Sequence, residues 1–464
     1  MTARSVIGLT FLVLALCASN TAFGSGGTNT IPEALVPSSG VSPAGTGMVS
    51  ASLVSERREN GIPVNTKITM SNWQQFEAFM PDGMSELFRG NHFWKMPEDV
   101  EIDVGPTQVF PQPQGYLEAT QKYGPATQME ILTNGHYALR NYVAGMPFPN
   151  PSEPNKGWKI LADTWYAPIP RIFAGTPETG LASVCAQDEA SRSKCFKMSY
   201  VDRMVSHIYT PGFPLTEPEA GGAWLTEWAM VEWPEELKYA ASLTIFSQDE
   251  EKPQDDYVFA PQLRQTLRVS TGARCAPLSG LDYTRDDARF GFNGGISLFQ
   301  AKWLRDQKVL ALTHMNTAEG VYPANYDMPL GFAKPLWGQW EVRDTYVIDV
   351  RRAESEAAGY CYGKRIMYID KAFVHEVWDD LFDPTMKLWK VMQFAVAPKL
   401  MHGSESSTFG SAWMGLWDLQ NRHATIMFTA DGPGRDMVVD EEVPKPYDNI
   451  SKYSTPGGLM MLMK

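Results

Sequence analysis

The sequence predicts a mainly β protein of the α+β class, built on one large, curved antiparallel sheet. Runs that alternate apolar and polar residues recur from Cys195 to Thr429, separated by turn residues such as Gly294-Gly295. After Gly338 the connections are too short for crossover helices, which favours antiparallel hairpins. A long meander of this kind must curl or close to bury one of its faces. We therefore expect an incompletely closed sheet with short covering helices and long loops.

The expected strands fill most of the chain after residue 194. They are Cys195–Ile208, Trp224–Val231, Tyr239–Phe246, Tyr257–Ser270, Ser297–Trp303, Val309–His314, Gly338–Val350, Tyr360–Ile369, Phe373–Phe382, Lys387–Val396 and Ala424–Thr429. The later strands are rich in Trp and Tyr, so one side of the meander should be strongly aromatic. Such side chains suit an adaptable ligand pocket, but they also fill ordinary large cores.

Residues 1–24 have the parts of a secretory signal peptide. Arg4 supplies the positive charge, and the apolar run that follows, residues 6–16, is too short to span a membrane. Small residues at Ala22 and Gly24 occupy the positions that a signal peptidase reads, so we expect cleavage after Gly24. Cys17 lies in a weak lipobox pattern, but the residue before it is a bulky Leu.

Beyond this leader, composition separates an arm from a single domain. Residues 25–60 are rich in Gly, Ser, Thr and Pro and should form a flexible N-terminal arm, whereas residues 61–464 should form one β-rich domain with insertions. No later run of about 18 apolar residues occurs, so no integral membrane span is expected after cleavage. The formal charge of −13 at pH 7 argues against nucleic acid as a partner.

Four cysteines follow the leader, namely Cys185, Cys195, Cys275 and Cys361. An even number in an exported chain indicates disulfides, and four cysteines allow three pairings. The first two flank a short polar loop, so a local bridge between them is geometrically easy, and the last two would then form a long-range bridge. There is no CxxC pair, which leaves a zinc ribbon or a thioredoxin-like site unsupported.

Two short helices are expected near the start of the domain. Ser71-Asn72 can cap a helix that carries Trp73, Phe76 and Phe79. After a turn at residues 81–83, a second helix would carry Met84, Leu87 and Phe88. Their apolar faces fit a lid over a sheet or ordinary covering helices.

Sequence motifs of enzymes are absent, and we expect a non-catalytic protein without metal or cofactor. The patterns GxSxG, HExxH, GxxxxGK[ST] and GxGxxG do not occur. The run His375 to Asp380 contains four residues of metal-ligand type, but strand alternation would split them between two faces, and we expect a solvated strand face there. Asp286-Asp287 and Asp379-Asp380 have the residue types of a glycosidase, although nothing fixes the separation that this chemistry requires.

One expected strand begins at Tyr257 and bends at a proline. Pro261 cannot lie in the middle of a regular strand, so it should mark the bend. After it, Leu263 and Leu267 alternate with Arg264 and Arg268. The two arginines would share a face, roughly 13 Å apart at about 3.3 Å per residue. Read from these residues alone, the segment is a curved strand with a solvated arginine face, followed by an acidic loop.

A proline-rich segment, residues 147–154, precedes another expected strand. Its four prolines keep the backbone extended and remove donors from any ladder, and Phe148 stands between two of them. From Gly157 to Tyr166 the chain is expected to return as a strand. The segment fits the rim of a binding cavity or a plain surface loop, since long loops are often functional.

Three stretches of the chain resemble one protein family. The most specific runs from Gly145 through Pro147-Phe148-Pro149 to Gly157-Trp158, and the others are Tyr257 to Phe292 and Lys364 to Lys390. Together they resemble domain-of-unknown-function family 1329, whose members look like enlarged relatives of the LolA/LolB-like outer-membrane lipoprotein-sorting superfamily. The resemblance extends from about Ile68 to the C-terminus.

This resemblance implies an incomplete LolA/LolB-like β-barrel whose apolar cavity holds lipid, lipoprotein or other hydrophobic cargo. It implies a periplasmic carrier of a Gram-negative bacterium, peripheral to the outer membrane, with an envelope transporter or outer-membrane protein as its partner. The alternative is an envelope protein that binds or acts on polysaccharide, because Trp-rich grooves also suit sugars.

The predicted ligand site lies on the aromatic meander and its rim. The predicted cavity and rim residues are Phe148, Trp158, Leu263, Leu267, Tyr346, Tyr368, Trp378 and Trp389. The predicted polar rim consists of Arg264, Arg268, Asp286 and Asp287.

Overall fold

The computed structural model describes residues 61–462 except 191, 270–273, 278–279, 290, 402–407 and 431–434. The predicted leader, its cleavage site, Cys17 and the predicted arm lie outside the described residues. Within the described part, no helix combines the length and the apolar character needed to cross a membrane.

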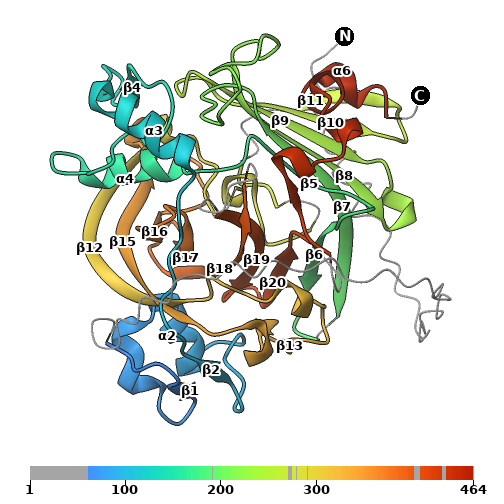
Figure 1. Ribbon diagram of the computed structural model, residues 1–464. Coiled ribbons are helices and arrows are strands. Elements are labelled where there is room, and N and C mark those ends of the chain that lie inside the picture. The colour runs from blue at the N-terminus through green and yellow to red at the C-terminus, as the bar shows by residue number, and fades with distance from the viewer. Residues whose placement is uncertain are drawn as a thin grey trace. The chain divides into compact units, whose positions relative to one another are not determined.

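One antiparallel sheet dominates the described part of the chain (Figure 1). Its strands are β5 (Ile172–Gly175), β6 (Ala182–Gln187), β7 (Ser193–Met204), β8 (Ala223–Trp233), β9 (Ala241–Ser247), β10 (Asp255–Ala260), β11 (Gln265–Val269), β12 (Phe299–Ala311), β15 (Glu341–Arg352), β16 (Lys364–Asp370), β17 (Glu376–Phe382), β18 (Leu388–Leu400), β19 (Thr408–Asp418), β20 (His423–Phe428) and β21 (Val438–Val439). The main path runs β11-β10-β9-β8-β7-β6-β20-β19-β18-β17-β16-β15-β12, with β5 joining β7 to β21. β11 and β12 end this path, so the predicted large antiparallel sheet, not closed into a barrel, is confirmed.

Helices and small sheets surround the main sheet. The α-helices are α2 (Asp82–Arg89), α3 (Gln114–Tyr123), α4 (Lys156–Trp165), α5 (Ile450–Tyr453) and α6 (Pro456–Leu459). The two-stranded sheets pair β1 (Lys67–Thr69) with β2 (Glu101–Asp103), β3 (Gln128–Ile131) with β4 (Tyr137–Arg140), and β13 (Tyr326–Asp327) with β14 (Phe332–Ala333). The 3-10 helices used below are η1 (Trp73–Phe79), η5 (Arg285–Asp287) and η11 (Lys445–Tyr447).

The sheet curves around residues 281–296, which we call the inner loop. Its Arg289 pairs with Glu227 on β8, and its Asp287 pairs with Arg365 on β16. Six strands separate β8 from β16 in the sheet, which would be roughly 34 Å of flat sheet at about 4.8 Å per step. Only a strongly curved sheet brings both strands to one short loop. The face that carries Glu227 and Arg365 is therefore the concave face (Figure 1).

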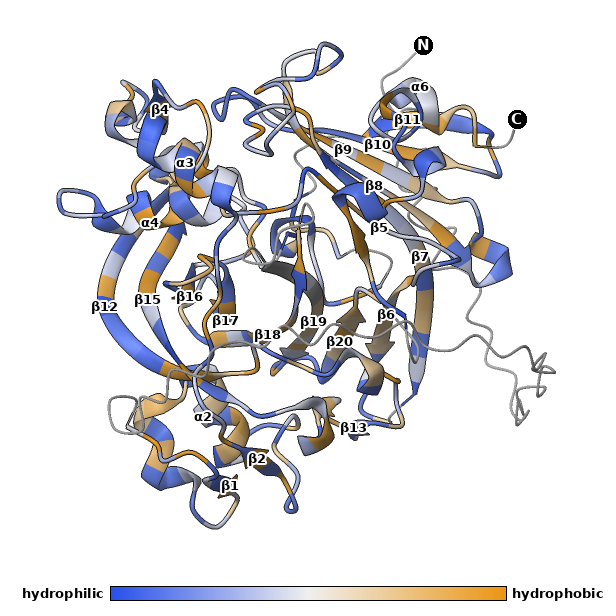
Figure 2. Ribbon diagram, viewed as in Figure 1, coloured by the Kyte–Doolittle hydropathy of each residue, from blue (hydrophilic) through white to orange (hydrophobic). Residues whose placement is uncertain are grey.

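The outer face of the sheet is covered at two places. Helix α2 packs against β17 and β18, and the Gly83 amide donates to the Asp380 carboxylate at 3.0 Å. Helix α6 packs against β9 and β10. Along most of β15, hydrophilic and hydrophobic residues alternate as the sheet pattern requires, whereas β12 carries an unbroken hydrophilic run from Arg305 to Lys308 (Figure 2). Strand β15 can therefore contribute one face to a covered core.

The helix pair near the N-terminus forms as expected, but its cap differs. Phe88 of α2 stacks on Trp73 of η1 with 5.5 Å between ring centroids. The predicted cap, Asn72, does not bond to the first turn of η1. Its side-chain oxygen accepts from the Thr69 amide at 2.8 Å, and its side-chain amide donates to the Lys67 carbonyl at 2.9 Å. Asn72 thus closes a turn after β1, and η1 begins without a side-chain cap.

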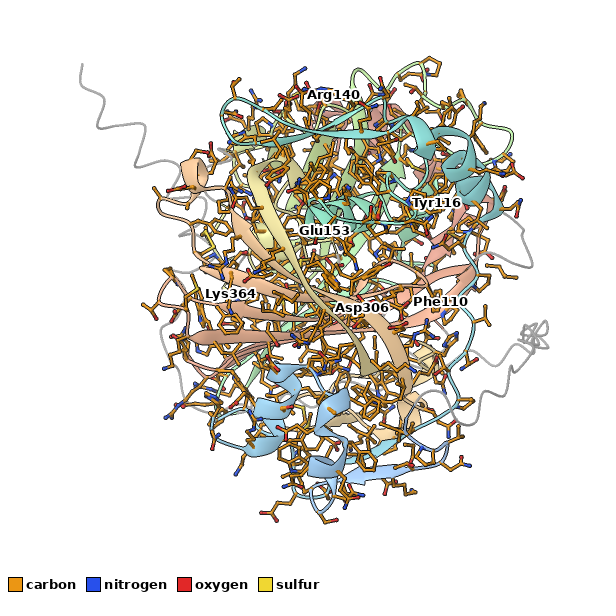
Figure 3. The ribbon with its side chains drawn as sticks, turned by 90° about the vertical axis from the view of Figure 1, so that its left-hand side faces the viewer. Phe110, Tyr116, Arg140, Glu153, Asp306 and Lys364 are labelled. Atoms are coloured by element: carbon orange, nitrogen blue, oxygen red, sulfur yellow. A yellow bond between two sulfur atoms is a disulfide. The ribbon has the colours of Figure 1, made fainter. Side chains whose placement is uncertain are left out.

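The strand expected at residues 157–166 is wrong, because this segment forms α4. Its buried residues Trp158, Leu161 and Trp165 follow helical spacing. Gly157 lets the helix lie directly on strand β12, since a Cβ there would be only 2.4 Å from the Trp303 amide nitrogen. Figure 3 shows this side of the molecule, with Glu153 ahead of α4 and Asp306 on β12.

Three further differences concern the strands. The two strands expected at Ser297–Trp303 and Val309–His314 are one strand, β12, with an irregularity between Trp303 and Arg305. Strand β19 was not expected, although it pairs along its full length with β18. The segment expected as one bent strand from Tyr257 is a hairpin, in which β10 pairs with β11.

Candidate functional site

Both predicted disulfides are present. Cys185 and Cys195 lie directly opposite each other on β6 and β7 and are bridged. The second bridge joins Cys275 to Cys361, 86 residues apart, and the Cys361 amide donates to the Cys275 sulfur at 3.0 Å. This bridge ties the segment before the inner loop to the start of β16.

The predicted cavity residues do not converge on one site. Tyr346 and Trp389 belong to the concave side of the sheet, whereas Tyr368 and Trp378 lie in the core on its outer side. The Tyr368 hydroxyl accepts from the Asp82 amide at 3.1 Å, and the Trp378 indole donates to the Leu310 carbonyl at 2.9 Å. These two side chains fill a packed core beneath α2 and are not free to line a shared cavity with the others.

The remaining predicted residues lie elsewhere. Trp158 is fully buried on α4 and donates to the Ile296 carbonyl at 3.1 Å, while Phe148 contacts it edge-to-face with 6.4 Å between centroids. Leu263 is exposed in the turn between β10 and β11, and Leu267 is half-buried on edge strand β11.

The predicted arginine face is also wrong in detail. Arg264 has a positive φ of 49° and lies in the hairpin turn, not in the strand with Arg268. Arg268 pairs with Asp255 across the hairpin. The bend at Pro261 is confirmed, because it opens this turn.

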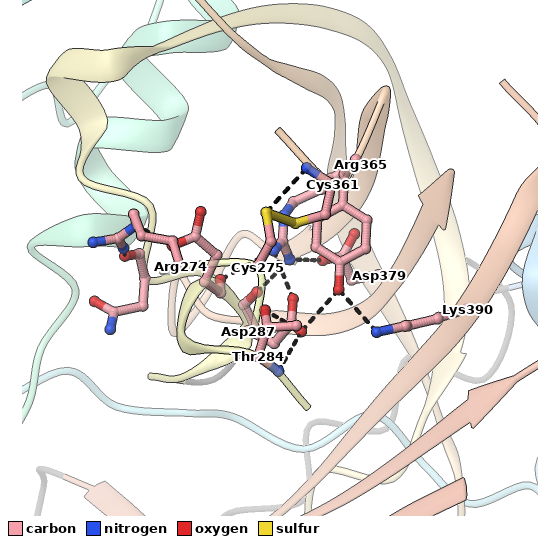
Figure 4. Close-up of polar contacts among 12 residues, drawn as sticks. Arg274, Cys275, Thr284, Asp287, Cys361, Arg365, Asp379 and Lys390 are labelled. Atoms are coloured by element: carbon pink, nitrogen blue, oxygen red, sulfur yellow. Dashed lines mark hydrogen bonds and ion pairs between the residues drawn. A yellow bond between two sulfur atoms is a disulfide. The ribbon is translucent and has the colours of Figure 1, made fainter. Parts of the chain in front are cut away.

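The inner loop is folded by a local motif that its sequence contains. Thr284 and Asp287 form a capping box at η5, in which the Thr284 amide and hydroxyl donate to one Asp287 oxygen at 2.9 and 2.7 Å. The other Asp287 oxygen accepts from Arg365 at 2.6 Å. Asp286 pairs with Arg274 (Figure 4). Asp286 and Asp287 are both fully buried, so the prediction that they form an exposed rim is wrong.

Arg365 connects the inner loop to the sheet. Besides Asp287, it donates to Asp379 at 3.1 Å and to the backbone carbonyls of Asp286 and Gly291 at 3.1 and 2.7 Å (Figure 4). Its side chain is 1% exposed. A buried guanidinium with this many acceptors fixes the position of the loop against β16 and β17.

The solvated strand face expected at residues 375–380 is wrong. Glu376, Asp379 and Asp380 are buried. The register shifts next to Val377, where Trp378 faces Tyr368 but Glu376 faces Ile369. This bulge turns Glu376 to the same concave face as Asp379, whereas regular alternation would separate them.

Burial and neighbouring charges set the protonation of these carboxyls. Burial raises the pKa of Asp379 to about 7 even though Arg365 opposes the shift. Burial, with the Asp379 charge, holds the pKa of Glu376 well above its ordinary range. Burial also acts to raise the pKa of Asp287, but Arg365 and Lys390 keep it below the ordinary value. The ion pair of Arg365 with Asp287 is therefore the charged anchor of the loop.

A second carboxylate pair lies across the concave face. Asp202 on β7 and Glu227 on β8 are direct cross-strand partners. Burial raises the pKa of Glu227 to about 7, and burial together with the Glu227 charge raises the pKa of Asp202 well above its ordinary value. Arg289 of the inner loop lies beside them, 3.4 Å from Glu227, with its guanidinium 4.3 Å from the Trp165 ring centroid.

The concave face is thus occupied by the protein's own inner loop. Its charged groups bind each other, which makes a structural network and leaves no aromatic trough along the predicted residues. Among the described residues, no group of three or more His, Cys, Asp or Glu side chains has the arrangement to hold a metal ion.

A cavity of about 190 Å³ lies instead on the outer face, between β7, β8 and the C-terminal helices. It is lined by Ser199, Trp228, Met230, Glu232, Tyr239, Tyr447, Lys452, Tyr453, Met461 and Leu462. Trp228 and Tyr453 meet edge-to-face with 4.8 Å between centroids, and Tyr447 stacks on Tyr453 at 5.4 Å. Ser199 donates to Glu232 at 2.7 Å. We call this the C-terminal cavity.

Sequence reasoning missed the C-terminal cavity, although part of the signal was present. Trp228, Met230 and Glu232 alternate along β8 and therefore share one face. Their partners Tyr447 and Tyr453 come from the end of the chain, where no element was expected. Nothing in the sequence shows that these distant segments meet.

An open antiparallel sheet, filled on its concave side and covered outside by short helices, defines the class of fold. The sequence profile of the family described as "Protein of unknown function (DUF1329)" matches residues 67–456, and the chain belongs to this family. No curated protein matches the chain.

We describe two of the solved structures that are similar to this chain. One is a DUF1329 family protein from Desulfovibrio piger, with 12% identity and a TM-score of 0.43 over 65% of this chain and 100% of that one. The other is a LolA superfamily protein from Nitrosomonas europaea, with 12% identity and a TM-score of 0.35 over 62% of this chain and 96% of that one.

Proposed function

We propose that this protein is a non-catalytic carrier or binding protein for hydrophobic cargo in the periplasm, where it meets the outer membrane and an envelope transporter. The observation that carries the proposal is the C-terminal cavity, which is lined mainly by aromatic and Met side chains. Ligand pockets are typically apolar concavities with a few placed polar groups, and Met suits adaptable apolar contacts.

Exposed apolar side chains lie close to this cavity in the fold. Tyr239 and Met461 line it and are 38% and 51% exposed. Met460, the residue before Met461, is 56% exposed. A cavity of about 190 Å³ is smaller than the roughly 300–1,000 Å³ of drug-sized pockets, so it suits one end of a cargo molecule. The remainder would lie against this apolar surface.

Two features support export. The first 24 residues have the pattern of a signal peptide. The two disulfides suit an oxidising compartment such as the periplasm.

The test is to extract the purified protein with organic solvent, to identify lipids by mass spectrometry, and to measure binding of a fluorescent fatty acid. We expect co-purifying lipid and binding that Met461→Asp weakens by about tenfold or more, because a charge then enters an apolar wall. Met386→Asp is the matched control, since Met386 is 46% exposed and does not line the cavity. Unchanged binding in Met461→Asp contradicts the proposal. An empty extract, with retention of the protein on polysaccharide gels, favours the polysaccharide alternative.

A further inference from the structure

The walls of the C-terminal cavity have the composition of an aromatic box. Four of its residues are aromatic, and they come from β8, from the connection between β8 and β9, and from the C-terminal segment that contains η11 and α5. Trp228 and Tyr453 are nearly perpendicular, with an interplanar angle of 84°, while Tyr447 and Tyr453 are nearly parallel, with an angle of 24°. Perpendicular rings form the corner of a box, and they present π faces in more than one direction.

Cations already lie at the faces of two of these rings. The Lys452 ammonium is 4.9 Å from the Tyr453 centroid, and the Lys238 ammonium is 5.6 Å from the Tyr239 centroid. Both distances are within the roughly 6 Å over which a ring face attracts a cation. In both cases the cation is the lysine that precedes the ring in the sequence, so these two ring faces already hold a positive charge of the protein itself.

Three polar side chains, Ser199, Glu232 and Lys452, and the Trp228 indole complete the walls. Glu232 brings a carboxylate to the cavity, where Ser199 orients it. Trp228 is only 2% exposed, and its buried indole N–H has no hydrogen-bond partner in the protein. Burial, with Glu178, Tyr453 and Glu232, raises the pKa of Tyr447 to about 12, so its phenol is neutral at ordinary pH. A buried donor without a partner is costly, and an oxygen atom on a ligand would satisfy it.

We propose that the C-terminal cavity binds a quaternary ammonium group, as found in choline and in choline-bearing amphiphiles. Aromatic cages are the usual recognition device for this group, because it carries full charge, donates no hydrogen bonds and is weakly hydrated. A volume of about 190 Å³ corresponds to roughly six water-sized atoms at about 30 Å³ each, which accommodates a trimethylammonium head and its first methylene. Glu232 brings a carboxylate to the ligand's ammonium in a cavity that the Lys452 ammonium also lines, and the Trp228 N–H bonds the neighbouring oxygen of the ligand.

This inference rests on the proposed function, because the ammonium would be the head of a cargo whose apolar part lies against the exposed Met461. The quaternary ammonium group can belong to free choline or to a choline lipid. Calorimetric titration with choline chloride tests the first. Co-sedimentation with phosphatidylcholine vesicles, compared with phosphatidylglycerol vesicles, tests the second.

The decisive comparison is choline against 3,3-dimethyl-1-butanol, its uncharged isostere. We expect choline to bind at least about tenfold more tightly, since desolvated cation–π contacts and a carboxylate act only on the charged ligand. Tyr447→Leu and Glu232→Gln should each reduce choline affinity by about threefold to thirtyfold, while Tyr447→Phe retains the ring and the affinity. Tyr447 is half-buried, so these variants preserve the packed core.

Matched controls lie outside the cavity. Tyr123→Leu removes a ring that also carries a lysine at its face, with 4.8 Å to Lys122, and Glu235→Gln removes an exposed carboxylate of the same β8–β9 connection. Both should leave choline binding unchanged. Equal binding of choline and the isostere overturns the inference but leaves an apolar cavity and the proposed function. Failure of both ligands to bind also overturns the inference, and the fatty-acid binding assay then tests the proposed function separately. Choline binding without vesicle binding supports the inference and identifies the free cation as ligand.

Discussion

Substitutions of Trp378 and Trp389 test whether these side chains belong to a packed core or line a ligand cavity. Trp378 is fully buried and hydrogen-bonded, so Trp378→Ala should cost about 3–5 kcal/mol of unfolding free energy. Trp389 is half-buried, and its indole donates to Asp418 at 2.8 Å, so Trp389→Ala should cost less. Chemical denaturation measures both, and a fluorescent fatty acid should bind both variants as it binds the natural protein. A small stability loss with lost binding in Trp378→Ala would show that Trp378 contacts cargo.

The raised pKa of Glu227 predicts that the stability of the protein depends on pH. Its pKa is raised from 4.5 to about 7, so the folded state holds a proton that the unfolded state releases. The stability that the protonated Glu227 carboxyl contributes is fully present below about pH 4.5 and is lost as the pH rises through about 7. Glu227→Gln removes this titration, and denaturation between pH 4.5 and 8 should show a shallower decline. Glu235→Gln is the control, because Glu235 is 82% exposed. Equal pH slopes in Glu227→Gln and the natural protein would contradict the assignment.

At the scale of elements, Arg365 holds the inner loop in the curve of the sheet. Arg365→Leu leaves Asp287 and Asp379 buried without their cation, which should cost about 3–5 kcal/mol. Because the loop then loses its anchor, limited proteolysis should cut within residues 281–296 more rapidly. Arg351→Leu is the control, since Arg351 is 49% exposed and its pair with Asp349 should contribute at most about 1 kcal/mol. Equal effects of the two substitutions would remove the anchor role from Arg365.

The same elements show what the sequence can predict. Strands β15 to β18 were expected because their residues alternate and their connections are short, and both features are local. Helix α4 was missed because the prolines before it suggested an extended arm, although Trp158, Leu161 and Trp165 follow a helical period. A helix there also requires Gly157 to meet the β12 backbone, and that contact joins residues about 145 positions apart.

The site was less predictable than the strands for a physical reason. Asp287, Glu376 and Asp379 look like surface residues because carboxylates are seldom fully buried. Their burial depends on Arg365 and on a one-residue bulge at Val377, and neither is visible before the strands are paired. The C-terminal cavity depends on residues 447 and 453 reaching β8, which the sequence does not indicate.

At the scale of the whole molecule, maturation can be tested directly. The apolar run of residues 6–16 and the small residues Ala22 and Gly24 predict a mature chain that begins at Ser25. Intact-mass measurement of protein exported by a Gram-negative host checks this. A diacylated Cys17 at the N-terminus would instead make the protein a lipoprotein.

The described residues should also unfold as one unit, because the sheet joins segments that are far apart in the chain. Residues 183–187 of β6 pair with residues 424–428 of β20, and β5 pairs with β21. The N-terminal helix α2 packs on β17 and β18, so no cut through the chain separates two independent cores. We therefore expect coincident denaturation curves from far-UV circular dichroism and Trp fluorescence, although chains of this size often populate intermediates.

With the Cys275–Cys361 bridge reduced, the single transition should move to lower denaturant, since a loop closed over 86 residues should stabilise by a few kcal/mol, roughly 2–5. Two resolved transitions in the oxidised protein would show that the sheet divides into separate folding units, and would contradict a single domain over residues 61–464.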